Sequence, residues 1–158
     1  WDKIKALTNS EHHEIREAAL KALANLVSQD DKTGVRNVIS LLSGAVSDSS
    51  FDVRMTVIEE LGDFKHEKAV TSIAIQLNAE KKRLRLAAIR ALAQTGHPSA
   101  TELVADLLSN RDYDIRREAI LALGKLGGDM AEQRLKARLE EEKDDELVSL
   151  IEKTLREI

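Results

Sequence analysis

Four histidines are the side chains of this sequence with the clearest capacity for metal or acid-base chemistry. His12 and His13 are adjacent, while His66 and His97 lie 31 residues apart, each in a short polar segment. Packed helices lie about 8–10 Å apart, whereas metal–nitrogen bonds measure about 2.1 Å. Histidines on neighbouring helices would share a metal only through strained side chains, and the next equivalent position is Gly128. We interpret the histidines as polar residues of turns and helix starts.

The residues of the sequence do not indicate covalent catalysis either. The chain has no cysteine, and no serine, histidine and acidic residue recur together at helical or repeat spacing, as a nucleophile and its base would require. We therefore predict no catalytic residue, metal or cofactor, and a protein that is not an enzyme. The lack of cysteine fits a reducing compartment, and no apolar run approaches the roughly 18 residues of a membrane span. We expect a soluble, cytoplasmic protein without membrane insertion.

A basic cluster suggests anion binding instead. Lys81, Lys82 and Arg83 are consecutive, and Arg117 follows farther along the chain. Such residues near helix N-termini could contact phosphates or an acidic partner. However, the net charge is −4, aromatic residues make up only 3% of the chain, and an acidic run extends over 140–146. These features disfavour nucleic acid as the partner.

The sequence repeats itself at an interval of 31 residues, which indicates the elements that carry these side chains. The offset aligns Val53 with Leu84 and Ile115, and it continues through a turn to align Leu77 with Leu108 and Leu139. A constant register over about 25 positions is typical of a repeat architecture. An arginine recurs as Arg54, Arg85 and Arg116, with several aspartates nearby: Asp48, Asp52, Asp112 and Asp114. The structural alternative for the basic residues is therefore a ladder of ion pairs between repeats.

Within each unit the apolar spacing predicts two helices separated by a turn, a helical hairpin. Since one hairpin cannot bury both faces, stacked hairpins should share a continuous core and form a right-handed solenoid. The predicted core consists of Leu20, Leu23, Val38, Leu42, Ile58, Leu61, Ile73, Leu77, Ile89, Leu92, Val104, Leu108, Ile120, Leu123, Leu135 and Leu139.

The repeat pattern extends over the whole chain, 1–158, and therefore predicts a single domain. We expect repeats at 10–46, 47–80, 81–110 and 111–142, with half units at 1–9 and 143–158. We also expect the chain to be a piece of a longer protein, because it starts without methionine and both ends fall within a unit. Uncapped half units would expose apolar surface, so we predict that end-to-end self-association can occur there.

The pattern D-x-x-V-R-x-x-A-x-x-A-L-G-x-x-G, present as "DYDIRREAILALGKLGG" and "RLRLAAIRALAQTG", resembles HEAT repeats, especially the short variety named after the phycobilin lyases. The resemblance implies an all-α right-handed superhelix of about four hairpins. Deoxyhypusine hydroxylase, a HEAT-like enzyme, carries His-Glu pairs just after the V-R step; here Glu17, Met55, Leu86 and Arg117 stand there. That activity is not expected.

In HEAT-like arrays the second helices line the concave face, so the resemblance implies a binding strip on them. Its residues lie opposite the buried positions and are polar and mildly acidic: Arg36, Ser40, Thr71, Ile75, Asn78, Glu102, Asp106, Gln133 and Glu140. We expect a non-catalytic scaffold or adaptor that binds a protein or peptide on this face. The alternative is a subunit of a bilin lyase-like enzyme or phycobilisome-handling protein, although few aromatic side chains are present to hold a tetrapyrrole. A mere spacer also remains open.

Overall fold

The chain folds entirely into helices. The computed structural model describes all 158 residues and contains no strand. The helices follow one another as α1 (Asp2–Leu7), α2 (His13–Asn25), α3 (Lys32–Gly44), α4 (Phe51–Gly62), α5 (Glu67–Ala74), η1 (Ile75–Asn78), α6 (Lys82–Thr95), α7 (Ser99–Ala105), η2 (Asp106–Ser109), α8 (Tyr113–Leu126), α9 (Gly128–Glu141) and α10 (Asp145–Glu157). The predicted all-α class is confirmed.

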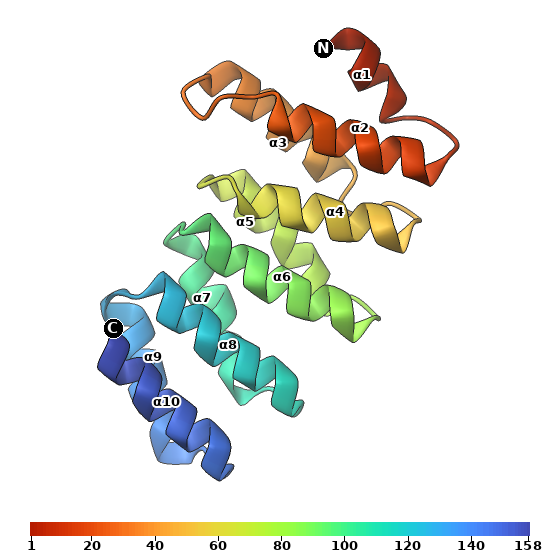
Figure 1. Cartoon of the computed structure of the whole chain (residues 1–158). Helices are drawn as coiled ribbons and strands as arrows, with labels where there is room; N and C mark the ends of the chain where they lie inside the picture. Colours follow the sequence, from red (N-terminus) through yellow and green to blue (C-terminus); the bar gives the residue numbers. More distant parts are fainter.

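Four helical hairpins lie side by side in two layers (Figure 1). The first helices, α2, α4, α6 and α8, pack in chain order, and α10 continues the row; we call this row the first-helix layer. The second helices, α3, α5 with η1, α7 with η2, and α9, form the second-helix layer behind it. The two chain termini lie at opposite ends of the array. This arrangement is the predicted solenoid.

Side chains at the helix starts explain where several helices begin. Asp31, Ser50, Asp112 and Asp144 are N-cap residues, and each accepts hydrogen bonds from backbone N–H groups of the first turn. These donors have no acceptor within the helix, so the caps stabilise the helix starts. Gly96 ends α6 with a φ of 59°, a left-handed conformation that glycine adopts at little steric cost.

Two of the second helices end in a turn of 3-10 helix, and the apolar spacing of the sequence did not predict this change of helix type. The α-helices α5 and α7 each continue directly into a 3-10 helix, η1 and η2. Such tightening is common at helix C-termini. In η1 the buried side-chain amide of Gln76 donates a hydrogen bond to the carbonyl of Val46 over 2.7 Å. This bond ties the second hairpin to the end of the first.

One continuous apolar core joins the hairpins. Of the predicted core residues, all are buried except Leu77 and Leu139, which are half-buried and pack against the same core. Additional buried side chains come from the first helices, among them Val53, Leu84 and Ile115, which are the residues that the repeat offset aligns. Since the core extends through every hairpin, each unit is held mainly by its neighbours.

The two ends of the array differ in how firmly they pack. Helix α1 contributes no buried residue, whereas α10 buries Leu147 and Ile151 against α8 and α9. Leu7 and Leu26 are exposed near one end and Ile158 at the other. Self-association through these ends stays a prediction. No helix has the length and apolar character that crossing a membrane would need.

Candidate functional site

The recurrent arginine binds the loop that precedes its own helix. In all four hairpins the guanidinium donates to the backbone carbonyls six and five residues earlier: Ser10 and Glu11 for Arg16, Asp48 and Ser49 for Arg54, Ala79 and Glu80 for Arg85, and Asn110 and Arg111 for Arg116. We call this contact the arginine clamp. Its main role is to fix the connection between hairpins.

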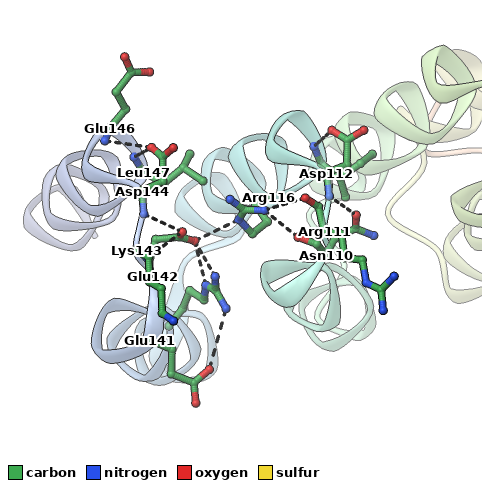
Figure 2. A network of polar contacts seen from close by, with 12 residues as sticks. Asn110, Arg111, Asp112, Arg116, Glu141, Glu142, Lys143, Asp144, Glu146 and Leu147 are labelled. Carbon is green, nitrogen blue, oxygen red and sulfur yellow. Dashed lines mark hydrogen bonds and ion pairs between the residues drawn. The ribbon is translucent and has the colours of Figure 1, made fainter.

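Two clamp arginines also reach an acidic residue just before the first helix of the next unit. Arg16 binds Asp48 through two hydrogen bonds of 2.8 and 2.9 Å, and Arg116 donates to Glu142 over 3.1 Å (Figure 2). The remaining clamp arginines, Arg54 and Arg85, form no ion pair with an acidic side chain. The predicted ladder is therefore confirmed only in part.

A lysine continues the ladder where the arginine does not. Lys82 forms ion pairs with Asp112, at 2.9 Å, and with Asp114, which joins the start of α6 to the start of α8. Its hydrogen bond holds the pKa of Asp112 below the ordinary value, against the opposing effect of burial. Asp52, which the ladder prediction included, takes no part in these pairs.

Three residues of the basic cluster contact other side chains of the protein, and the fourth is exposed. Lys81 and Arg83 lie over the ring of Phe51, with 4.6 and 5.7 Å between the cationic groups and the ring centre, a favourable cation–π arrangement. Lys82 is held by the aspartates, and Arg117 is exposed on α8. An anion or acidic partner at these residues stays a prediction.

The histidines take part in turns. The Nδ1 atom of His66 accepts a hydrogen bond from the backbone N–H of Lys68 over 3.0 Å, so it caps α5. The Nδ1 atom of His97 lies 2.7 Å from the hydroxyl of Ser99, the first residue of α7. No group of three or more histidine or acidic side chains is placed to hold a metal ion. The interpretation of these residues as turn residues agrees with their contacts.

All nine residues of the predicted binding strip are exposed, and all lie in the second-helix layer. Most of them have no side-chain partner within the protein. Two exceptions are Ser40, which accepts a hydrogen bond from Lys68 over 3.2 Å, and Asp106, which pairs with Arg134 at 3.1 Å. The structure thus exposes every strip residue on the second helices, and the use of the strip for binding stays a prediction.

A wide groove lies on the opposite layer. A groove of about 710 Å³ crosses α4, α6 and α8, and it is lined by Met55, Glu59, Glu60, Asp63, Arg83, Ala87, Arg90, Ala91, Ala93, Gln94, Glu118, Leu121, Ala122 and Lys125. Alanines on α6 and α8 leave room between larger neighbours. We call this hollow the first-helix groove. It shares only Arg83 with the predicted site residues.

The charges of the first-helix groove are distributed unevenly. On α6 and α8 the cations have partners, because Arg90 pairs with Glu118 at 2.8 Å and Lys125 donates to Gln94. On α4, burial raises the pKa of Glu60 above its ordinary value, and neither Glu60 nor Glu59 forms an ion pair. The groove therefore carries an unpaired acidic wall.

Sequence reasoning missed this groove, although a signal was present. At the repeat interval Glu60 aligns with Ala91 and Ala122, and Glu59 aligns with Arg90 and Leu121. Neither position keeps one residue type from repeat to repeat, and the two acidic side chains occur in the second hairpin alone.

Comparisons with solved structures agree with the architecture. A designed armadillo repeat protein in complex with the peptide (KR)4 superposes with a TM-score of 0.66 and 16% identity over 98% of this chain and 80% of that chain. The complex of CpcE and CpcF of phycocyanin lyase from Nostoc sp. PCC7120 gives 0.64 and 18% identity over 97% and 96%. At these identities the similarity shows the fold alone.

A sequence relative points in the same direction. The phycocyanobilin lyase subunit alpha of Nostoc sp. strain PCC 7120 is 33% identical over 125 residues, which covers 72% of this chain. The chain spans 43% of the length of that subunit. The family model described as HEAT repeats matches residues 3–80 and 70–156. With the hairpins and their shared core, these matches show that the chain belongs to the HEAT-repeat family.

Proposed function

We propose that this chain is a non-catalytic interaction scaffold that holds a protein or peptide on the strip of its second-helix layer. The observation that carries the proposal is that all nine strip residues, which come from four consecutive hairpins, are exposed. A partner lying along them would meet many weak polar contacts on a rigid support. Repeat solenoids offer extended surfaces of this kind, and the designed armadillo protein that matches this fold is in complex with a peptide.

The middle and end of the strip are acidic, which defines the partner further. Glu102, Asp106 and Glu140 are exposed carboxylates on α7, η2 and α9. They favour a partner with a basic or mixed surface over a phosphate backbone, because like charges across an interface oppose association. Asp106 is already paired with Arg134, so Glu102 and Glu140 carry most of the unpaired charge.

Charge reversal on the strip tests this function. We expect the wild-type chain to capture a partner from a lysate of its source cell, and the triple variant E102K/D106K/E140K to lose that partner. A matched control, D30K/E80K/E152K, changes the net charge by the same amount at exposed positions outside the strip and the groove. Circular dichroism verifies equal helicity. Equal capture by all three proteins would contradict the proposed role of the strip.

A second candidate is a subunit of a bilin lyase-like enzyme, favoured by the 33% identity to phycocyanobilin lyase subunit alpha. Arg83, Arg90 and Lys125 line a groove large enough for a ligand and would be the basic residues nearest an acidic pigment. If this candidate is correct, titrating phycocyanobilin with the purified chain changes the pigment's absorbance, and R83A/R90A/K125A weakens that change. An unchanged spectrum would exclude pigment binding by this chain on its own.

A further inference from the structure

The acidic wall of the first-helix groove lacks partners within the protein. Glu59 and Glu60 line the groove from α4, and Asp63 lines it directly after the end of that helix. Only Asp63 accepts a hydrogen bond from a neighbouring side chain, a long one of 3.4 Å from Gln94. These three carboxylates repel each other and form no ion pair within the protein, so a cation placed among them would be favourable.

The rest of the groove does not offer that cation. Arg90 is bonded to Glu118, Lys125 to Gln94, and Arg83 lies over the ring of Phe51. Burial raises the pKa of Glu60, and the positive charge of Lys21 on α2 partly offsets this rise. Lys21 forms no ion pair with Glu60. None of these cations forms an ion pair with the wall, so a basic group from another molecule could pair with it.

The floor beside this wall is apolar and shallow. Ala87, Ala91 and Ala122 are nearly buried there, and Leu121 on α8 stays partly exposed. An ideal Cβ at Gly62 would lie 3.3 Å from the Cα of Ala91, so α4 and α6 already approach closely beneath the floor. The side chains are too short to fill the space above them, and an aliphatic group of moderate size fits there.

We propose that the first-helix groove binds an extended segment of a partner protein that carries lysine or arginine beside an aliphatic side chain. The basic residues meet the wall on α4 and the aliphatic residue covers the alanine floor. Three packed helices span about 16–20 Å from the first axis to the third, which about six extended residues cover at about 3.3 Å each. This site lies on the opposite layer from the strip and is independent of it.

A synthetic peptide tests the proposal directly. The probe is a fluorescein-labelled peptide of sequence Lys-Lys-Ala-Leu-Ala-Ala, and its match has glutamate in place of both lysines. Fluorescence anisotropy at low salt measures the affinity of each for the purified chain. We expect the lysine peptide to bind at least tenfold more tightly than the glutamate peptide, and its affinity to fall as salt screens the charges.

Variants locate the peptide on the protein. E59Q/E60Q/D63N removes the charges of the wall, and we expect at least a tenfold loss of affinity. The control D30N/E80Q/E152Q removes the same number of charges from exposed positions outside the strip and the groove, and it should leave the affinity unchanged. A87L, which fills the floor without changing charge, should also weaken binding. In nitrogen–proton correlation spectra of the wild type, the amide signals of α4 and α6 should shift most.

Several results would overturn the proposal. They are equal affinity for the lysine and glutamate peptides, unchanged binding by E59Q/E60Q/D63N, or signal shifts confined to the second-helix layer. Absence of measurable binding by the lysine peptide at millimolar concentration would overturn it as well. Loss of binding by the strip variant E102Q/D106N/E140Q, with unchanged binding by E59Q/E60Q/D63N, would also overturn it and would assign the peptide to the strip.

Discussion

Glu142 joins three helices through a single carboxylate. It accepts hydrogen bonds from Arg116 on α8 and from Arg138 on α9, and from the backbone N–H groups of Lys143 and Asp144 before α10 (Figure 2). Its side chain is only 3% exposed. Burial alone would raise its pKa, but the bonds from Arg138 and the backbone outweigh burial and lower it. The carboxylate thus stays charged and holds the last turn in place.

At this scale we predict that Glu142→Gln destabilises the protein by about 1–3 kcal/mol at neutral pH, because two arginines lose their counter-charge. The pKa of Glu142 is lowered on folding, so its stabilisation is complete above the unfolded value of about 4.3. It is lost as the pH falls through the folded value. The difference between wild type and variant should therefore shrink progressively below about pH 4.

Urea denaturation at pH 7 and at pH 3 measures this difference. Glu140→Gln is the matched control, since that side chain is exposed two positions away and should change stability by less than about 0.5 kcal/mol. If Glu142→Gln were equally harmful at both pH values, the charge of the carboxylate would not be the source of the stability.

Helix pairs depend on glycine where they approach most closely. An ideal Cβ at Gly124 on α8 would lie 2.6 Å from the Cγ2 methyl of Thr154 on α10. Thr154 cannot turn freely, because it is buried and its hydroxyl donates to the carbonyl of Leu150 over 2.8 Å. The methyl group and the missing Cβ are therefore complementary features of the α8–α10 contact.

We predict that Gly124→Ala destabilises the protein, although alanine favours a helix by about 1 kcal/mol over glycine. The clash with Thr154 should outweigh that gain, since overpacking costs about 1–3 kcal/mol. In a Thr154→Ser background the methyl is absent and the hydroxyl remains, so the same substitution should become neutral or stabilising. Thermal unfolding of the two single variants and the double variant measures the change of sign. Equal effects of Gly124→Ala in both backgrounds would refute the clash.

The whole molecule is a row of units held by their neighbours. The core of 34 buried residues passes through every hairpin without interruption, so a central helix is supported on both sides and a terminal helix on one. In such arrays stability is approximately the sum of unit and interface contributions. Local opening should therefore begin at the ends of the row.

Hydrogen exchange tests this gradient. We expect the amides of α4, α6 and α8 to exchange slowest and those of α1 fastest, because α1 has no buried residue. Helix α10, which buries Leu147 and Ile151, should be intermediate. Leu92→Ala in the centre should cost about 2–5 kcal/mol and speed exchange on both sides of α6. Uniform exchange along the chain would show instead that the array unfolds as a single cooperative unit.

The sequence predicted the architecture well because the repeat interval and the apolar spacing describe the same contacts. Leu61, Leu92 and Leu123 recur every 31 residues and are all fully buried. The exposure of the strip residues followed from the same register. These features depend on periodicity, which a single sequence displays.

The remaining features depend on which side chains meet across helices. Glu142 lies in an acidic run that suggested only surface charge, and its burial depends on two arginines that the repeat pattern does not link to it. The acidic wall of the first-helix groove stays unpaired because Arg90 forms its ion pair with Glu118 and not with a carboxylate of the wall. Which side chains pair across helices depends on the three-dimensional arrangement, and a periodic sequence pattern does not reveal it.

The arginine clamp has a consequence for how such a chain can change over generations. The acceptors of Arg54 and Arg85 are main-chain carbonyls five and six residues upstream, and every amino acid supplies a carbonyl. Mutation can therefore alter the loop side chains freely while the contact persists. A duplicated 31-residue segment would bring its own clamp with it, so a gene could lengthen by copying units without any matching mutation elsewhere.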